Sequence, residues 1–147
     1  MINEITEEND MVELGEVLKE FYKMMPYKQK EVDVSHWASV WMNLLSVGVG
    51  RVLGLWKGGL IVGGIGILIT PALEDGTLVA QEAFWFVTGE SRGGGMKLFI
   101  KGEEMARAAG VKRMHMIHLT NSMPDKLKKL YERRGYSKVE TTYMKEF

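Results

Sequence analysis

Two stretches near the start of the chain carry apolar residues at helical spacing. The first repeat comprises Leu14, Val17, Leu18, Phe21, Tyr22 and Met25, and the second comprises Val34, Trp37, Val40, Trp41, Leu44 and Leu45. Both repeats predict amphipathic helices that bury one face. Asp10 with Glu13 would cap the first helix and Pro26 would end it, whereas Asp33 or Ser35 would cap the second.

Most of the remaining chain alternates between strand-like and helical segments. Segments with strand character are 51–56, 60–70, 78–87, 113–119, 136–139 and 142–147, and segments with helical character are 95–109 and 124–134. Gly58 and Gly59 separate the first two strands and predict a hairpin. Helices, antiparallel strands and a strand–helix–strand unit together predict one mixed α/β (α+β) domain over residues 1–147, with helices on both faces of one sheet.

The charge balance argues against some classes of partner. Among 147 residues, 19 are lysine or arginine and 19 are aspartate or glutamate, so no net charge attracts nucleic acid or an anionic membrane. The chain has no cysteine, an acidic start unlike a signal peptide, and apolar segments broken by glycine unlike a spanning helix. We therefore expect a cytoplasmic protein that binds neither nucleic acid nor a membrane.

The segment from Phe84 to Ala109 is typical of a main-chain site for an anion. It runs from an apolar strand through Arg92 and three glycines, Gly93 to Gly95, into a helix. Glycines let a ligand approach the main chain, and the first turn of a helix points unpaired N–H groups at negative charge. The nucleotide P-loop pattern fails because Gly-Lys-Ser/Thr is missing, and the dinucleotide fingerprint fails at Leu98. We expect a phosphate or pyrophosphate here.

This loop resembles the acetyl-CoA loop of the GNAT (Gcn5-related) N-acetyltransferases. That loop has Gln or Arg, two residues, Gly, one residue, then Gly or Ala; the chain matches it at Arg92 and Gly95 and departs at Lys97. Asn121 follows a predicted strand as in the family, and Leu130 to Tyr136 is similar to the family's Tyr-Glu-x-x-Gly-Phe/Tyr segment. The resemblance implies a GNAT fold with a mostly antiparallel central sheet.

The same resemblance is good over residues 50–147 and implies an activity. It implies an acetyl-CoA-dependent N-acetyltransferase that moves the acetyl group directly to a primary amine. The run Gln81 to Val87 is particularly similar to small GNAT proteins of bacteriophages and prophages. A protein lysine or an N-terminal amine would then be a reasonable acceptor, and homodimers are common among relatives.

The residues implied to contact the cofactor gather around the loop. They are Phe86, Val87, Thr88, Arg92, Gly93, Gly94, Gly95, Met96, Lys97 and Asn121. The main chain of residues 86–88 would pair with the pantetheine arm, where the family leaves this strand splayed from its parallel neighbour. Arg92 and the N–H groups of residues 93–97 would hold the pyrophosphate. Asn121 would be either a cap and turn residue or a contact of the cofactor.

Amide formation from a thioester needs a base for the amine and an acid for the departing thiolate. Glu82 lies on the strand before the loop, where an apolar setting would raise its pKa, and the resemblance implies that it accepts the amine proton. The alternative is a structural glutamate paired with a lysine or arginine. Tyr131 matches the family's tyrosine near the CoA sulfur, and the alternative is a packed aromatic residue.

Several further expectations concern partners. His115 and His118 do not predict a metal site, because residues three apart on a strand point to opposite faces. Met25 to Lys30 and Tyr143 would line the acceptor entrance without selecting one class of amine. The alternative function is a catalytically inactive GNAT-fold module that binds CoA or a protein, and nucleic-acid binding through the basic residues at 126–134 is a weaker third candidate.

Overall fold

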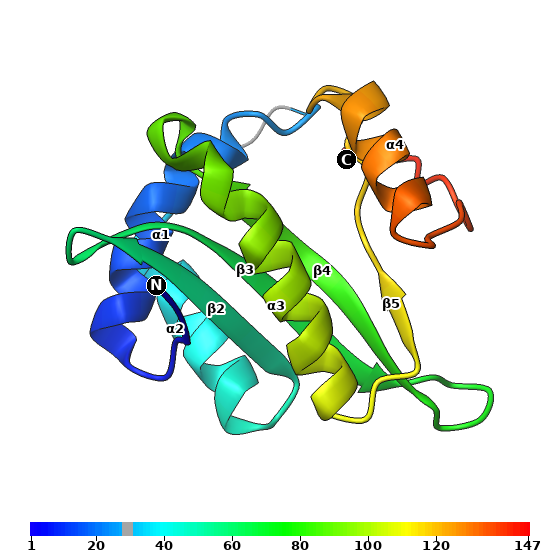
Figure 1. Cartoon of the computed structure of the whole chain (residues 1–147). Helices are drawn as coiled ribbons and strands as arrows, with labels where there is room; N and C mark the ends of the chain where they lie inside the picture. Colours follow the sequence, from blue (N-terminus) through cyan, green and yellow to red (C-terminus); the bar gives the residue numbers. More distant parts are fainter. Residues whose placement is uncertain (28–30) are drawn as a thin grey trace.

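A single sheet runs through the molecule (Figure 1). The computed structural model describes residues 1–27 and 31–147, apart from the side chains of Glu90 and Arg92. Five strands lie in the order β1-β2-β3-β4-β5; the first four pair antiparallel, and β5 pairs parallel with β4. The predicted mixed sheet, mostly antiparallel, is confirmed.

The elements follow the predicted order with one added strand at the start. The strands are β1 (Ile2–Glu4), β2 (Gly50–Lys57), β3 (Leu60–Pro71), β4 (Leu78–Val87) and β5 (Arg113–His115). The helices are α1 (Glu8–Tyr22), α2 (Val34–Ser46), the 3₁₀ turn η1 (Gly89–Gly94), α3 (Gly95–Ala108) and α4 (Pro124–Arg133). Across the described residues, none of these helices is long and apolar enough to cross a bilayer.

Helices cover both faces of the sheet, as predicted. In Figure 1, α3 crosses in front of the sheet, and α1 and α2 lie behind it. The core on the α1–α2 side includes Met11, Leu14, Leu18, Trp37, Trp41, Val52, Ile61 and Phe84. The core on the α3 side includes Leu53, Leu55, Ile65, Ile67, Ala80, Leu98 and Ala106. α4 lies beside α3, because the rings of Tyr131 and Phe99 approach to 6.1 Å between centroids.

One irregularity in β4 decides which side chains face each core. Gly66 pairs with Phe84 and Ile67 pairs with Glu82, so Ala83 is an extra residue in β4. Such a bulge breaks the two-residue alternation of a strand. Ala83 and Phe84 therefore both pack against the α1–α2 core, whereas Glu82 follows Ala80, a member of the α3-side core, onto the opposite face.

The predicted cap of α1 is wrong, and the predicted cap of α2 at Asp33 is confirmed. α1 begins at Glu8, so Asp10 lies within its first turn and forms no cap. Glu13 instead accepts a hydrogen bond from the Ile61 main-chain N–H at 2.9 Å, which fastens α1 to the sheet. Asp33 accepts from the His36 N–H at 3.0 Å, in the usual geometry of an N-cap.

The predicted strands at 136–139 and 142–147 are wrong, and the predicted strand at 113–119 is reduced to three residues. Residues after Gly135 have no regular structure, and beyond Tyr136, whose ring packs against Phe99, their apolar side chains stay exposed, to 92% at Tyr143 and 112% at Phe147. Strand formation depends on neighbours that bury a face, and these side chains lack such neighbours. The short strand β1 was not predicted because three residues carry too little periodicity.

Gly66 offers a test of the packing at the bulge. A Cβ atom at this position would come within 2.3 Å of the Phe84 ring, which Trp37 and Trp41 hold in place at centroid distances of 5.7 and 5.3 Å. We expect Gly66→Ala to lower the free energy of unfolding by about 1–3 kcal/mol in urea denaturation, the usual cost of overpacking. Gly89→Ala is the control, since a Cβ there meets no atom within 4 Å. Equal stability of the two variants would contradict this account.

Candidate active site

The strands β4 and β5 separate inside the sheet. Their parallel ladder contains the pairs Val79 with Arg113, Ala80 with Met114, and Gln81 with His115. Beyond it β4 continues to Val87, whereas the chain after His115 leaves the strand conformation over residues 116–119. The expected splay is therefore present, and it opens a gap along the second half of β4 (Figure 1).

The main chain of β4 presents alternate residues to this gap. The Thr88 N–H donates to the Val62 carbonyl of β3 at 2.9 Å. In an antiparallel pair the N–H and C=O of successive residues point to opposite sides, so those of Phe86 also face β3 and those of Val87 face the gap. Phe86, Val87 and Thr88 were expected to pair with pantetheine, and of these three only Val87 has its main-chain N–H and C=O facing the gap. Trp85 does so too, and sequence reasoning missed it because the direction depends on the register of β3.

Glu82 lies at the point where the two strands separate. Its side chain is 6% exposed and accepts a hydrogen bond from the Ile117 N–H at 3.3 Å. Burial raises the pKa of the Glu82 carboxyl to about 8, and the Ile117 N–H opposes this shift by favouring the charged form. The alternative of an ion pair is not observed: no lysine or arginine among the described residues pairs with Glu82. A carboxyl in this state is mostly protonated at pH 7 and becomes able to accept a proton as the pH approaches 8.

Tyr131 reaches the same residue from α4. Its side chain is 8% exposed, and its hydroxyl donates to the Ile117 carbonyl at 2.8 Å. Burial raises the pKa of the Tyr131 hydroxyl well above its ordinary value, and the nearby charge of Glu82 raises it further. The hydroxyl therefore stays protonated at neutral pH. The structure brings the two predicted catalytic residues to the main chain of one residue, Ile117, whose contacts use main-chain atoms and leave no signal in the sequence.

The three glycines before α3 differ in what surrounds them. A Cβ at Gly93 would meet no atom within 4 Å, whereas one at Gly94 would come within 2.3 Å of Leu55 Cδ2. The Gly95 carbonyl accepts a hydrogen bond from the Trp85 indole N–H at 3.0 Å, which fixes the first residue of α3. Gly93 is thus the glycine that leaves open space for a ligand, and Gly94 is needed for packing against β2.

The helix that follows suits an anion at its start. α3 begins at Gly95 as predicted, and its first turn contains no acidic residue. Met96 and Lys97 are exposed there, and the first-turn N–H groups lack partners within the helix. The side chain of Arg92 lies outside the described residues, so its expected contact stays a prediction.

Asn121 is not a helix cap. The N-cap position of α4 is Met123, in a left-handed conformation with φ of 44°, and no side chain caps it. The Asn121 amide donates instead to the Met24 carbonyl at 2.7 Å, just beyond the end of α1. It therefore joins the segment before α4 to the connection between α1 and α2, and its expected contact with the cofactor stays a prediction.

The two histidines have separate surroundings. His115 ends β5, and His118 lies beyond the strand, with its Nε2 atom 2.6 Å from the Pro124 carbonyl oxygen and its ring 6.5 Å from that of Tyr131. Among the described residues no group of three histidine, cysteine, aspartate or glutamate side chains could hold a metal ion.

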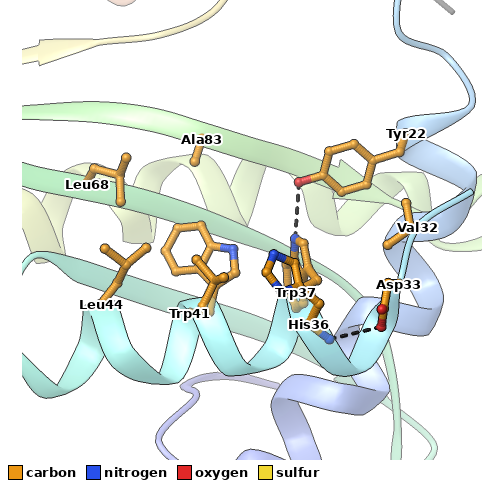
Figure 2. A pocket seen from close by; sticks show the side chains of 10 residues that line it. Tyr22, Val32, Asp33, His36, Trp37, Trp41, Leu44, Leu68 and Ala83 are labelled. Atoms are coloured by element: carbon orange, nitrogen blue, oxygen red, sulfur yellow. Dashed lines mark hydrogen bonds between the residues drawn. The ribbon is translucent and has the colours of Figure 1, made fainter. Parts of the chain in front are cut away.

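A groove of about 440 Å³ lies between α2 and the strands β3 and β4 (Figure 2). Its lining comprises Tyr22, Val32, Asp33, His36, Trp37, Val40, Trp41, Leu44, Leu68 and Ala83. These are not the residues expected at the acceptor entrance. Met25 packs against the α1–α2 core, Tyr143 is 92% exposed in the C-terminal segment, and Lys28 to Lys30 lie outside the described residues.

The known proteins that match this chain are solved structures. The sequence matches no family model and no curated protein. A ribosomal-protein-alanine N-acetyltransferase from Brucella melitensis biovar Abortus 2308 is 19% identical, with a TM-score of 0.73 over 100% of this chain and 99% of that chain. A predicted acetyltransferase from Clostridium acetobutylicum, solved with acetyl-CoA, is 13% identical, with a TM-score of 0.72 over 99% and 96% of the two chains.

Proteins of other description share the architecture. A transcriptional regulator from Bacillus halodurans C-125 is 23% identical, with a TM-score of 0.78 over 100% of this chain and 99% of that chain. Identities this low establish the fold and not the activity. The narrower likeness to bacteriophage proteins stays a prediction. The chain has the mixed α/β fold of the GNAT acetyltransferases.

Proposed function

We propose that this protein is an acetyl-CoA-dependent N-acetyltransferase that moves the acetyl group directly to a primary amine. One observation carries the proposal: a buried carboxyl with a pKa of about 8, Glu82, lies where β4 separates from β5. The acetyltransferases that share the fold, including one solved with acetyl-CoA, support this function. The expected homodimer, the cytoplasmic location and the absence of nucleic-acid and membrane partners stay predictions.

The residues around α3 fit the cofactor. Open space at Gly93 and the N–H groups that begin α3 would accept the pyrophosphate, with Lys97 adding positive charge. The main chain of Trp85 and Val87 would bind the pantetheine arm in the gap beside β4. Bound there, acetyl-CoA supplies an acetyl group activated as a thioester. No residue of the chain needs to carry the acetyl group covalently.

Glu82 and Tyr131 divide the proton transfers. The amine nitrogen attacks the thioester carbonyl, the C–S bond breaks, and the amine loses a proton to Glu82. Tyr131 is the candidate to give a proton to the departing thiolate, because its raised pKa keeps the hydroxyl protonated. In the present structure that hydroxyl donates to the Ile117 carbonyl, so it must leave this partner to act as the acid.

Cofactor binding is tested by thermal unfolding. Acetyl-CoA at about 100 times its dissociation constant should stabilise the protein by roughly 2.7 kcal/mol and raise Tm by several degrees. We expect Gly93→Glu to abolish this shift, since its carboxylate would repel the pyrophosphate, without loss of the fold, since the site is open. Gly93→Gln is the matched control, similar in size and uncharged, and it should retain part of the shift. An unchanged shift in Gly93→Glu would place the cofactor elsewhere.

Measurements of turnover test the two proposed catalytic residues separately. Release of free CoA thiol, measured with a panel of primary amines, should rise with pH up to about pH 8, the pKa of Glu82. We expect Glu82→Gln to lower kcat/KM by about 10²- to 10⁴-fold, the usual loss when a general base is removed. Acetyl-CoA binding with no turnover on any amine would instead favour the inactive module.

Tyr131→Phe then distinguishes two roles of Tyr131. If the hydroxyl acts only as an acid, kcat falls and the rising limb of the pH profile stays in place. If the hydroxyl also holds Ile117 in place, its loss weakens the hydrogen bond from the Ile117 N–H that lowers the pKa of Glu82. The pKa of Glu82 then rises, and the rising limb of the pH profile moves to higher pH. We expect both a lower kcat and this upward shift. An unchanged profile would contradict the link through Ile117.

The pH dependence of stability tests the pKa of Glu82 without any substrate. The pKa of its carboxyl rises from 4.5 to about 8 on folding, so between these values the folded state keeps a proton that the unfolded state has lost. The stabilisation is complete below the lower value and is lost as pH rises through the higher one, by at most roughly 1.4 kcal/mol per pH unit. We expect the stability difference between the natural protein and Glu82→Gln to change with pH in this direction in urea titrations. A difference that is constant from acid to alkaline pH would show that Glu82 is ionised when folded.

A further inference from the structure

The groove beside α2 has two distinct ends. On its sheet side lies Ala83 of β4, the bulge residue that follows Glu82 in sequence, and Leu44 and Leu68 lie at one end (Figure 2). At the other end lie Asp33 and His36, at the start of α2 (Figure 2). A volume of about 440 Å³ lies within the range of pockets that hold small organic ligands.

The groove and Glu82 lie on opposite faces of the sheet at neighbouring residues of β4. The bulge turns Ala83 toward α2 and leaves Glu82 on the α3 side. The β4–β5 ladder ends at Gln81 and His115, so Glu82 lies one residue beyond the last paired position, with the Ile117 N–H on its carboxyl. An amine in the groove and a thioester on the α3 side would therefore meet at the gap.

The lining of the groove is apolar over most of its length. Its apolar members are Val32, Trp37, Val40, Trp41, Leu44, Leu68 and Ala83. Trp37 and Trp41 lie with their ring centroids 6.1 Å apart on successive turns of α2. The Trp37 indole N–H is already donated to the Tyr22 hydroxyl at 3.1 Å, so this donor is not available to a ligand. Such a wall favours a flat or aliphatic group over a hydroxylated one.

The lining contains one carboxylate, that of Asp33. Asp33 uses Oδ1 to cap α2, and within the described part of the chain Oδ2 has no hydrogen bond or ion pair. One carboxylate attracts a single positive charge, whereas a ligand with several ammonium groups would lose hydration without matching partners here.

Resting on the transferase function proposed above, we infer that this groove is the acceptor site and that it takes a small amine with one positive charge, carried on an aromatic or aliphatic body. The apolar body lies against Trp37, Trp41 and Val40, and the amino group points past Ala83 toward Glu82. Asp33 attracts the ammonium form during approach, before the amine loses its proton. Polyamines and aminoglycosides are poor acceptors.

The probe is 2-phenylethylamine, and its binding is measured without acetyl-CoA. Addition of the probe should shift the indole N–H resonances of Trp37 and Trp41 in a saturable way, and leave those of Trp56 and Trp85 unchanged. In turnover with acetyl-CoA the same amine should exceed spermidine and kanamycin in kcat/KM by about tenfold or more, an advantage of 1.4 kcal/mol.

Two variants test the groove while sparing the core. Val40 is 40% exposed on α2, so Val40→Phe fills the groove without overpacking the interior, and it should weaken 2-phenylethylamine about tenfold or more. Ser39→Phe is the matched control, because Ser39 is exposed on the same helix and outside the lining. It should bind the probe as the natural protein does.

The charge of Asp33 is tested by Asp33→Asn, because asparagine caps a helix as well as aspartate. We expect the association rate of 2-phenylethylamine to fall roughly two- to fivefold at low salt, because Asp33 acts during approach, and that of the neutral 2-phenylethanol to stay unchanged.

The outcomes separate this inference from the transferase function. If 2-phenylethylamine binds in a Val40-sensitive way but no amine is ever acetylated, the groove is supported as an amine site and the transferase is contradicted. If spermidine, kanamycin or a peptide amine is acetylated at a rate that Val40→Phe leaves unchanged, the inference about the groove is overturned and the transferase stands. Failure of the probe to bind overturns it equally.

Discussion

The bulge at Ala83 fixes the positions of the residues on which the candidate site depends. Without it, strict alternation would place Glu82 on the same face as Phe84 and Phe86, which pack against the α1–α2 core. A carboxyl there would lie among the apolar side chains of that core. The extra residue rotates Glu82 to the other face at the residue where β4 loses its parallel neighbour. Gly66 permits this geometry, because no other residue leaves room for the Phe84 ring.

Two opposing effects then set the protonation state of Glu82. Desolvation disfavours the carboxylate, and a single main-chain donor, Ile117, favours it. One hydrogen bond to a charged group contributes about 1.5–3 kcal/mol, whereas burial of a carboxylate costs several kcal/mol, so desolvation prevails. A full complement of donors or a nearby lysine would have returned the pKa to the acidic range. The sparse environment of Glu82 is thus what suits it to accept a proton.

Sequence patterns predicted the helices and strands whose boundaries are determined by their own residues. The apolar run at 78–87 and the glycines before α3 gave the correct bounds of β4 and the correct start of α3. Features that depend on contacts between distant segments were missed: Glu13 supports β3 and caps nothing, and the β-prone C-terminal residues find no partner strand. The main-chain atoms of Ile117, Trp85 and Val87 acquire their proposed roles from strand register, and strand register cannot be read from the sequence alone. The groove was missed because residues of α2 that looked like core also line its wall.

On the proposed function, the same geometry would give the two substrates separate faces of one sheet. The glycine loop and α3 lie on one face, and the groove along α2 lies on the other, so neither ligand needs to pass the other to reach the gap. Ala83 and Glu82 are adjacent in sequence yet face opposite sides, which brings the proposed acceptor groove and the proposed base within one peptide of each other. Changes in the lining at Val40 or Leu44 can therefore alter which amine fits without disturbing Glu82 or the loop at Gly93. A fold arranged in this way can vary its acceptor while the face expected to bind the cofactor stays constant.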